Sequence, residues 1–218
     1  MRFPNAAKGI KKVFTSNILT LIAAIAIIVG IVLSLVTLVA AATENEGGTI
    51  GAALGTVVLL VVAGVLMIVA FIIQIIGISQ ASKDESYFKT AMICLFVGIV
   101  GSLVGSIFSA NTVVSGICNT VTQIMNLAVT LFVISGIVKL ANQLNNSAVI
   151  KKGGNLIKVI TAVYVLALIG NLIVLILGGY VASITACVIA LVAVLLEIVA
   201  YFMYLSLLGK AKKMLEQE

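Results

Sequence analysis

One acidic residue, Glu197, lies inside an otherwise apolar stretch that runs from Ala182 to Leu208. Of the twenty residues from 189 to 208, twelve are Leu, Ile, Val or Phe, and each lowers the free energy of membrane insertion by roughly 0.3 to 0.6 kcal/mol. An acid near the centre of a helix raises that free energy by roughly 2.5 to 3.5 kcal/mol, less than the apolar side chains together supply. The stretch therefore predicts a membrane-spanning helix, in which Glu197 is the candidate site for a proton, a cation or a polar partner.

A second chemical feature is a polar stripe within the apolar segment 113–138. Its amide and hydroxyl side chains recur at intervals of three and four residues, so they share one face of a helix. They are Asn119, Thr122, Gln123, Asn126 and Thr130. Because an unsatisfied amide in hydrocarbon costs several kcal/mol, this face must contact other helices or water. Together with Glu197, these residues form a candidate polar core or transport path.

Small residues form two further patterns that favour close helix packing. Gly98, Gly101 and Gly105 recur at intervals of three and four residues in the segment 90–110, with serines between them. Gly51 and Gly55 form a small-xxx-small pair in the segment 50–79. Such faces let two backbones approach closely, which is how helices associate where lipid offers no hydrophobic drive.

The residue types that are missing argue against an enzyme. The chain has no His and only three Cys, all within apolar runs, so it lacks the ligand cluster that a zinc site needs. Intramembrane aspartyl proteolysis needs two acids at depth and only one is present, and serine proteolysis of the rhomboid kind needs a His. We therefore expect no catalytic activity, no metal and no other cofactor.

The composition is that of a membrane protein without a separate soluble domain. Hydrophobic residues make up 62% of the 218 residues and charged residues 9%, and the mean hydropathy is +1.32. The apolar runs predict an all-α integral membrane protein, a bundle of six transmembrane helices in a single domain that covers residues 1–218. The predicted spans are about 18–42, 50–79, 90–110, 113–138, 159–179 and 182–208, and the longest connection is predicted at 139–158.

The basic residues predict the orientation. With six spans, all thirteen Lys and Arg residues fall on one side of the membrane, and the other side carries only Glu44 and Glu46. By the positive-inside rule both termini are cytoplasmic. Lys outnumbers Arg twelve to one, which favours a bacterial cytoplasmic membrane. The basic inner face is suited to anionic lipid headgroups, whereas nucleic acid is an unlikely partner because the positive charges form no stripe with interleaved aromatics.

Residues 1–16 precede the first predicted span and allow two interpretations. Phe3, Ala6, Ile10 and Val13 recur at helical spacing with lysines between them, which predicts an amphipathic lead-in at the membrane surface. The same residues also fit an ordinary basic flank that holds the start of the span in the cytoplasm.

The cytoplasmic ends of the spans suggest three copies of a two-helix hairpin. The copies begin near Lys12, Lys89 and Lys158, each at the start of an odd-numbered span. In the same register Met67, Asn126 and Glu197 are counterparts near the middle of the even-numbered spans. Because basic residues mark the inner ends of most membrane helices, this register is a hypothesis that burial can test.

Two functional hypotheses follow from these features. In the first, the protein is a structural or accessory subunit that associates with itself or with another membrane protein, and the polar stripe holds helices together. In the second, it is a small transporter or channel for a proton, an ion or a small solute, with Glu197 as the binding site and the stripe lining the path.

Overall fold

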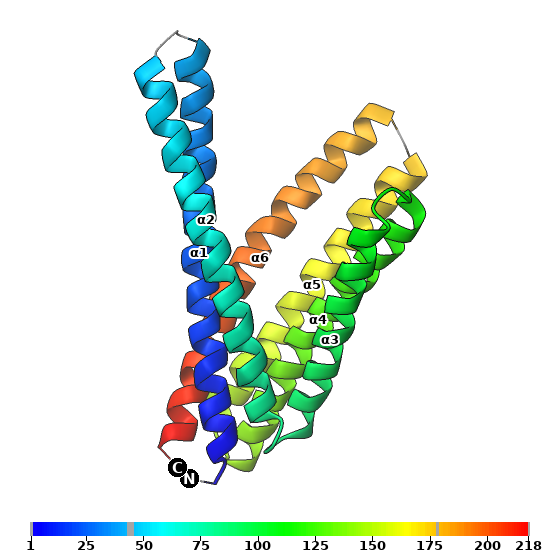
Figure 1. The fold of residues 1–218 in the computed structure, drawn as a ribbon. Coiled ribbons are helices and arrows are strands. Elements are labelled where there is room, and N and C mark those ends of the chain that lie inside the picture. The colour runs from blue at the N-terminus through cyan, green and yellow to red at the C-terminus, as the bar shows by residue number, and fades with distance from the viewer. Residues whose placement is uncertain (1, 43–45, 178, 218) are drawn as a thin grey trace. The chain divides into compact units, whose positions relative to one another are not determined.

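The computed structural model describes residues 2–42, 46–177 and 179–217. Within this part the fold is entirely helical, with six helices and no strand (Figure 1). The helices are α1 (Pro4–Ala42), α2 (Glu46–Ala81), α3 (Ser86–Ile107), α4 (Thr112–Gln143), α5 (Ser147–Leu177) and α6 (Gly179–Glu216). The all-α prediction is confirmed. Glu44 and the rest of 43–45 lie outside the described residues.

Five of the described helices contain a segment long and apolar enough to cross a membrane. These segments are Pro4–Val39, Ala53–Ala81, Ser86–Ile107, Val113–Gln143 and Leu191–Glu216. The predicted fifth span, 159–179, begins within α5, which ends at Leu177, and much of the span's second half lies outside the side chains that the structure describes. The helices therefore fit a multi-pass membrane protein, and the sixth crossing remains a prediction.

The helices extend well beyond the predicted spans on the lysine-rich side. The long connection predicted at 139–158 is wrong, because α4 continues to Gln143 and only the residues 144–146 separate it from α5. Asn145 has a φ of 54°, and the Asn146 amide donates to the Ala141 carbonyl at 2.8 Å, the pattern of a Schellman C-cap. The Asn146 side chain then accepts from the Val149 amide at 3.1 Å and caps α5. Polar residues that suggested a loop therefore form one tight turn.

The contacts divide the chain into two compact units, Met1–Ile10 with Ile78–Glu218, and Lys11–Gly77. In the first unit α3 packs against α4, α4 against α5, and α5 against α6. In the second unit α1 and α2 form an antiparallel hairpin (Figure 1).

Small residues at seven-residue intervals mark the packed face of most helices. In the hairpin of α1 and α2, Ala23 and Gly30 are buried on one helix and Ala63 and Ala70 on the other. A Cβ at Gly30 would lie 3.7 Å from the Leu60 side chain, so the two backbones run close together there. A repeat of seven residues keeps one seam facing the partner helix over several turns.

The same spacing recurs in the first unit. In α3 the buried small residues are Ala91, Gly98 and Gly105, and in α6 they are Ala193 and Ala200. Larger side chains complete a core between the helices toward the lysine-rich end. The largest fully buried ones in this unit include Phe88, Ile134, Ile137, Leu140, Leu156 and Leu207.

Two adjacent glycines in α5 allow a direct test of this close packing. A Cβ at Gly153 would overlap Cγ2 of Val138, a stiff side chain of α4, whereas a Cβ at Gly154 meets no atom within 4 Å. Gly153→Ala should therefore lower the free energy of unfolding by about 1 to 3 kcal/mol. Gly154→Ala should leave it unchanged or raise it by about 0.5 to 1 kcal/mol, because alanine favours a helix. Thermal unfolding of both variants in detergent measures the difference, and equal behaviour of the two would show that α4 and α5 are not in contact at this point.

Candidate functional site

The polar stripe of α4 lies against the glycines of α3. Thr122 Oγ1 donates to the Cys118 carbonyl at 2.9 Å and lies 3.4 Å from the Gly98 carbonyl of α3. A Cβ at Gly101 would lie only 3.0 Å from the same hydroxyl. The glycine face of α3 and the polar face of α4, which the sequence offered as separate features, therefore meet at one interface.

Two asparagines of the stripe occupy the same interface. Asn126 Oδ1 lies 3.7 Å from the position of a Cβ at Gly98, and Asn119 Oδ1 lies 3.9 Å from that of a Cβ at Gly105. Their residues remain exposed overall, so each amide lies at the edge of the interface. The contact between α3 and α4 thus accounts for three of the five stripe residues.

The other two stripe residues have different surroundings. Thr130 Oγ1 donates to the Asn126 carbonyl one turn earlier at 3.2 Å, so it is satisfied within its own helix. Gln123 has an exposed side chain, and its backbone carbonyl lies 3.5 Å from the hydroxyl of Tyr164 on α5. That distance is at the limit of a hydrogen bond. Gln123 therefore faces α5 and not α3.

Glu197 lies apart from the stripe, on an exposed position of α6. No hydrogen bond or ion pair joins it to any residue of the described chain. The hydroxyl of Tyr164 on α5 lies 3.5 Å from the Gln123 carbonyl of α4, so Tyr164 joins α5 to α4. No pattern in the sequence pointed to Tyr164, because its contact crosses 41 residues and depends on how α4 and α5 meet.

The predicted small-residue pair of α2 has two different environments. A Cβ at Gly55 would lie 3.5 Å from Leu33 Cδ1 of α1, an ordinary packing distance. A Cβ at Gly51 would meet no described atom within 4 Å. Gly55 is thus at the seam of the α1–α2 hairpin, while Gly51 lies beside open space.

A charged cluster holds α3 to α4 at the lysine-rich end. Lys139 Nζ lies 2.9 Å from Glu85 Oε1 and 5.3 Å from the centre of the Tyr87 ring, and the Ser86 hydroxyl donates to the same carboxylate at 3.1 Å. Burial alone would raise the pKa of Glu85, but the hydrogen bonds from Lys139 and Ser86 favour the charged form and bring the pKa below its ordinary value of 4.5. The carboxylate is therefore ionised and paired at neutral pH.

The neighbouring acid, Asp84, caps the first helix from another part of the chain. Its carboxylate accepts from Asn5 Nδ2 and from the Ala6 amide, both at 2.8 Å. Pro4 opens α1, where its missing N–H is no loss, and a negative charge at this end complements the helix dipole. Residues 4–16 of the predicted lead-in therefore belong to α1 itself, and Ala6 and Ile10 are fully buried in the protein.

The Glu85 pair predicts a pH-dependent stability with a defined sign. Folding lowers the pKa of Glu85, so its ion pair adds to the free energy of unfolding above about pH 4.5. This contribution is lost as the pH falls through the pKa that Glu85 has in the folded protein. Glu85→Gln should lower the free energy of unfolding by about 1 kcal/mol at pH 7, and this deficit should shrink below pH 4.5. Thermal unfolding of both proteins between about pH 7 and pH 3 measures the deficit across the lowered pKa, with the exposed Glu216→Gln as control. A deficit that stays constant over this range would contradict the ion pair.

The described residues offer one unpaired acid within an apolar helix segment, and a set of amides and hydroxyls of which Asn119, Thr122 and Asn126 lie in or beside the α3–α4 interface. No group of three or more His, Cys, Asp or Glu residues in the described part of the chain is placed to hold a metal ion. The arrangement can bind a proton or form a hydrogen bond at Glu197. Comparison with known proteins found no matching family model, no similar curated protein and no similar solved structure.

Proposed function

We propose that this protein is a non-enzymatic, multi-pass membrane subunit that binds a partner helix through the Glu197 face of α6. The observation that carries the proposal is the contrast between the two polar features of the spans. Thr122 lies within the interface of α3 and α4, and Asn119 and Asn126 lie at its edge beside glycines of α3, whereas Glu197 forms no hydrogen bond or ion pair with any residue of the described chain. The stripe therefore acts within the protein, and Glu197 is left to act outside it.

Membrane energetics favour a partner at this position. An acid near the centre of a span raises the free energy of insertion by roughly 2.5 to 3.5 kcal/mol, and it keeps most of that cost if it faces lipid. A polar group on a neighbouring helix offsets about 0.6 to 2 kcal/mol through a hydrogen bond. The flanking residues Val194, Leu195 and Ile198 are between 50% and 55% exposed, so a helix that covers Glu197 would also cover apolar surface. The partner is a second copy of this chain or another membrane protein.

The contacts of the first unit support the proposed orientation. Arg2 contacts the Gln143 carbonyl, Asn5 contacts Asp84, and Lys139 contacts Glu85. These contacts gather the N-terminus, the connection of α2 to α3 and the end of α4 at one end of this unit. In the proposal that end faces the cytoplasm of a bacterial cell, both termini lie there, and all six helices cross the membrane.

The burial pattern supports the three-hairpin register for the even-numbered helices. When Met67, Asn126 and Glu197 are aligned, the buried Ala70, Val129 and Ala200 fall together. The next positions seven residues on, Gly77, Gly136 and Leu207, are also buried. In this register Met67 and Asn126 are exposed like Glu197, so the three counterparts share a position at or beyond the edge of the packed face.

Replacing the acid tests the partner-binding proposal. Glu197→Leu removes the hydrogen-bonding group and should convert an assembly larger than the 22.6 kDa chain into the monomer, measured on native gels of mild detergent extracts and by cross-linking in membranes. Glu197→Gln keeps a donor and an acceptor and should retain most of the assembly. Leu191→Ala, at an exposed apolar position of the same helix, is the control. An assembly unchanged by Glu197→Leu would remove the proposal's main support.

The transport hypothesis keeps one specific observation in its favour, the contact of the Tyr164 hydroxyl with the backbone carbonyl of Gln123 in the polar stripe. Single cysteines at positions 126 and 197, in a chain without its native cysteines, separate the two functions. A charged, membrane-impermeant thiol reagent should label neither position if α3 covers Asn126 and a helix covers Glu197. Labelling of both positions would reveal an aqueous path and favour transport over partner binding.

A further inference from the structure

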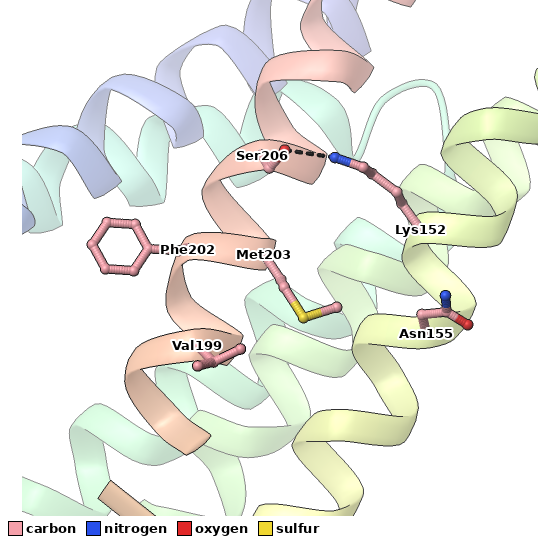
Figure 2. Close-up of a pocket in the computed structure, with 6 residues that line it drawn as sticks. All are labelled: Lys152, Asn155, Val199, Phe202, Met203 and Ser206. Carbon is pink, nitrogen blue, oxygen red and sulfur yellow. Dashed lines mark hydrogen bonds between the residues drawn. The ribbon is translucent and has the colours of Figure 1, made fainter. Parts of the chain in front are cut away.

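A cavity of about 490 Å³ lies between α5 and α6, near the lysine-rich end of the first unit. Two residues of α5 and four of α6 line it, as Figure 2 shows. They are Lys152, Asn155, Val199, Phe202, Met203 and Ser206. None of them belongs to the polar stripe or to the Glu197 face discussed above.

One end of the cavity is polar and positively charged. Lys152 Nζ donates to Ser206 Oγ at 2.7 Å, which joins α5 to α6 (Figure 2). Lys210 lies one turn beyond Ser206 on α6, and Asn155 adds an amide one turn after Lys152 on α5. Partial burial, and then the nearby charge of Lys210, lower the pKa of Lys152. Lys152 thus lies at this end of the cavity, and Lys210 lies just beyond it on the same face of α6 as Ser206.

No carboxylate in the described part of the chain pairs with either of these two lysines. The contrast with Lys139 is instructive, because that lysine is paired with Glu85 at 2.9 Å. Two neighbouring ammonium groups repel each other unless an anion lies between them. An anionic ligand near Lys152 and Lys210 would therefore offset a repulsion that no carboxylate of the described chain offsets.

The other end of the cavity is apolar and opens to the outside of the helix. Val199 and Phe202 are 50% and 56% exposed, and Met203 lies on the side of α6 toward α5 (Figure 2). All three lie within the segment Leu191–Glu216 that can cross a membrane. Ser206 and Val199 are seven residues apart, so the polar and apolar ends are separated by about 10 Å along the helix. Charge at one end and hydrocarbon at the other is the pattern of an amphiphile.

We propose that this cavity binds an anionic phospholipid, with its phosphate between Lys152 and Lys210 and one acyl chain along Val199, Phe202 and Met203. Phosphate oxygens accept from both ammonium groups, from the Ser206 hydroxyl and from the Asn155 amide. The acyl chain covers apolar side chains that otherwise face the bilayer. The site is independent of the partner helix proposed for Glu197.

Lipid binding to the purified full-length protein tests the proposal. Native mass spectrometry in detergent compares phosphatidylglycerol with phosphatidylcholine of the same acyl chains. We expect one tightly bound phosphatidylglycerol and weaker phosphatidylcholine. Lys152→Gln with Lys210→Gln should weaken phosphatidylglycerol binding about thirtyfold, and Lys210→Gln alone, at an exposed position, about fivefold.

A charge-matched variant separates the site from general surface attraction. Lys151→Gln with Lys213→Gln removes the same charge from exposed positions outside the cavity and should leave binding nearly unchanged. Equal losses in the two double variants, or equal binding of the two lipids, would overturn the proposal. Inorganic phosphate should compete poorly because it lacks the acyl chain. Competition as effective as that of a soluble short-chain phosphatidylglycerol would show a phosphate site only and would also overturn it.

Discussion

The constraint on which the structure depends is the absence of a hydrophobic drive between helices in lipid. In lipid, close contact between helices has to take the place of the hydrophobic effect. The chain makes such contact possible with small residues at seven-residue intervals. Ala23 and Gly30 in α1, Ala63 and Ala70 in α2, and the small residues of α3 all follow this rule. Dispersion contacts between closely spaced backbones then supply the attraction that hydrocarbon does not.

The same constraint determines how the polar side chains within the spans are accommodated. Hydroxyl residues in the spans mostly donate to the carbonyl four residues earlier, as Thr37, Thr120 and Thr161 do at 2.9 Å. The amides of Asn119 and Asn126 lie where the glycines of α3 leave room for them. Glu197 differs from these groups, because no residue in the described part of the chain forms a hydrogen bond or an ion pair with its carboxyl group and no glycine face lies beside it. Its cost to insertion has to be offset from outside, which is the physical basis of the proposed partner interface.

Positive charge is used in two ways at the lysine-rich end. Lys139 is bound by Glu85 and lies over Tyr87, so it fastens α3 to α4. Lys152 lines a cavity with an apolar far side, Lys210 lies one turn beyond its Ser206, and no carboxylate of the described chain pairs with either lysine. The first arrangement is satisfied within the protein, whereas the proposed phospholipid would supply the anion for the second.

The sequence by itself determined the all-helical membrane class, because long apolar runs have no other stable form in a bilayer. It also identified the polar stripe, the glycine faces and Glu197, since helical periodicity places residues on faces without knowledge of the partner helix. It failed where local composition and tertiary contact disagree: the Asn-rich segment after Lys139 forms a three-residue turn between extended helices instead of a long loop. Only the tertiary structure decided that the stripe meets the glycines of α3, that Tyr164 meets the Gln123 carbonyl, that Asp84 caps α1, and that Lys152 meets Ser206. The physical reason is that each of these contacts joins different helices, and the spacing of residues along one helix carries no information about the rotation and position of its neighbour.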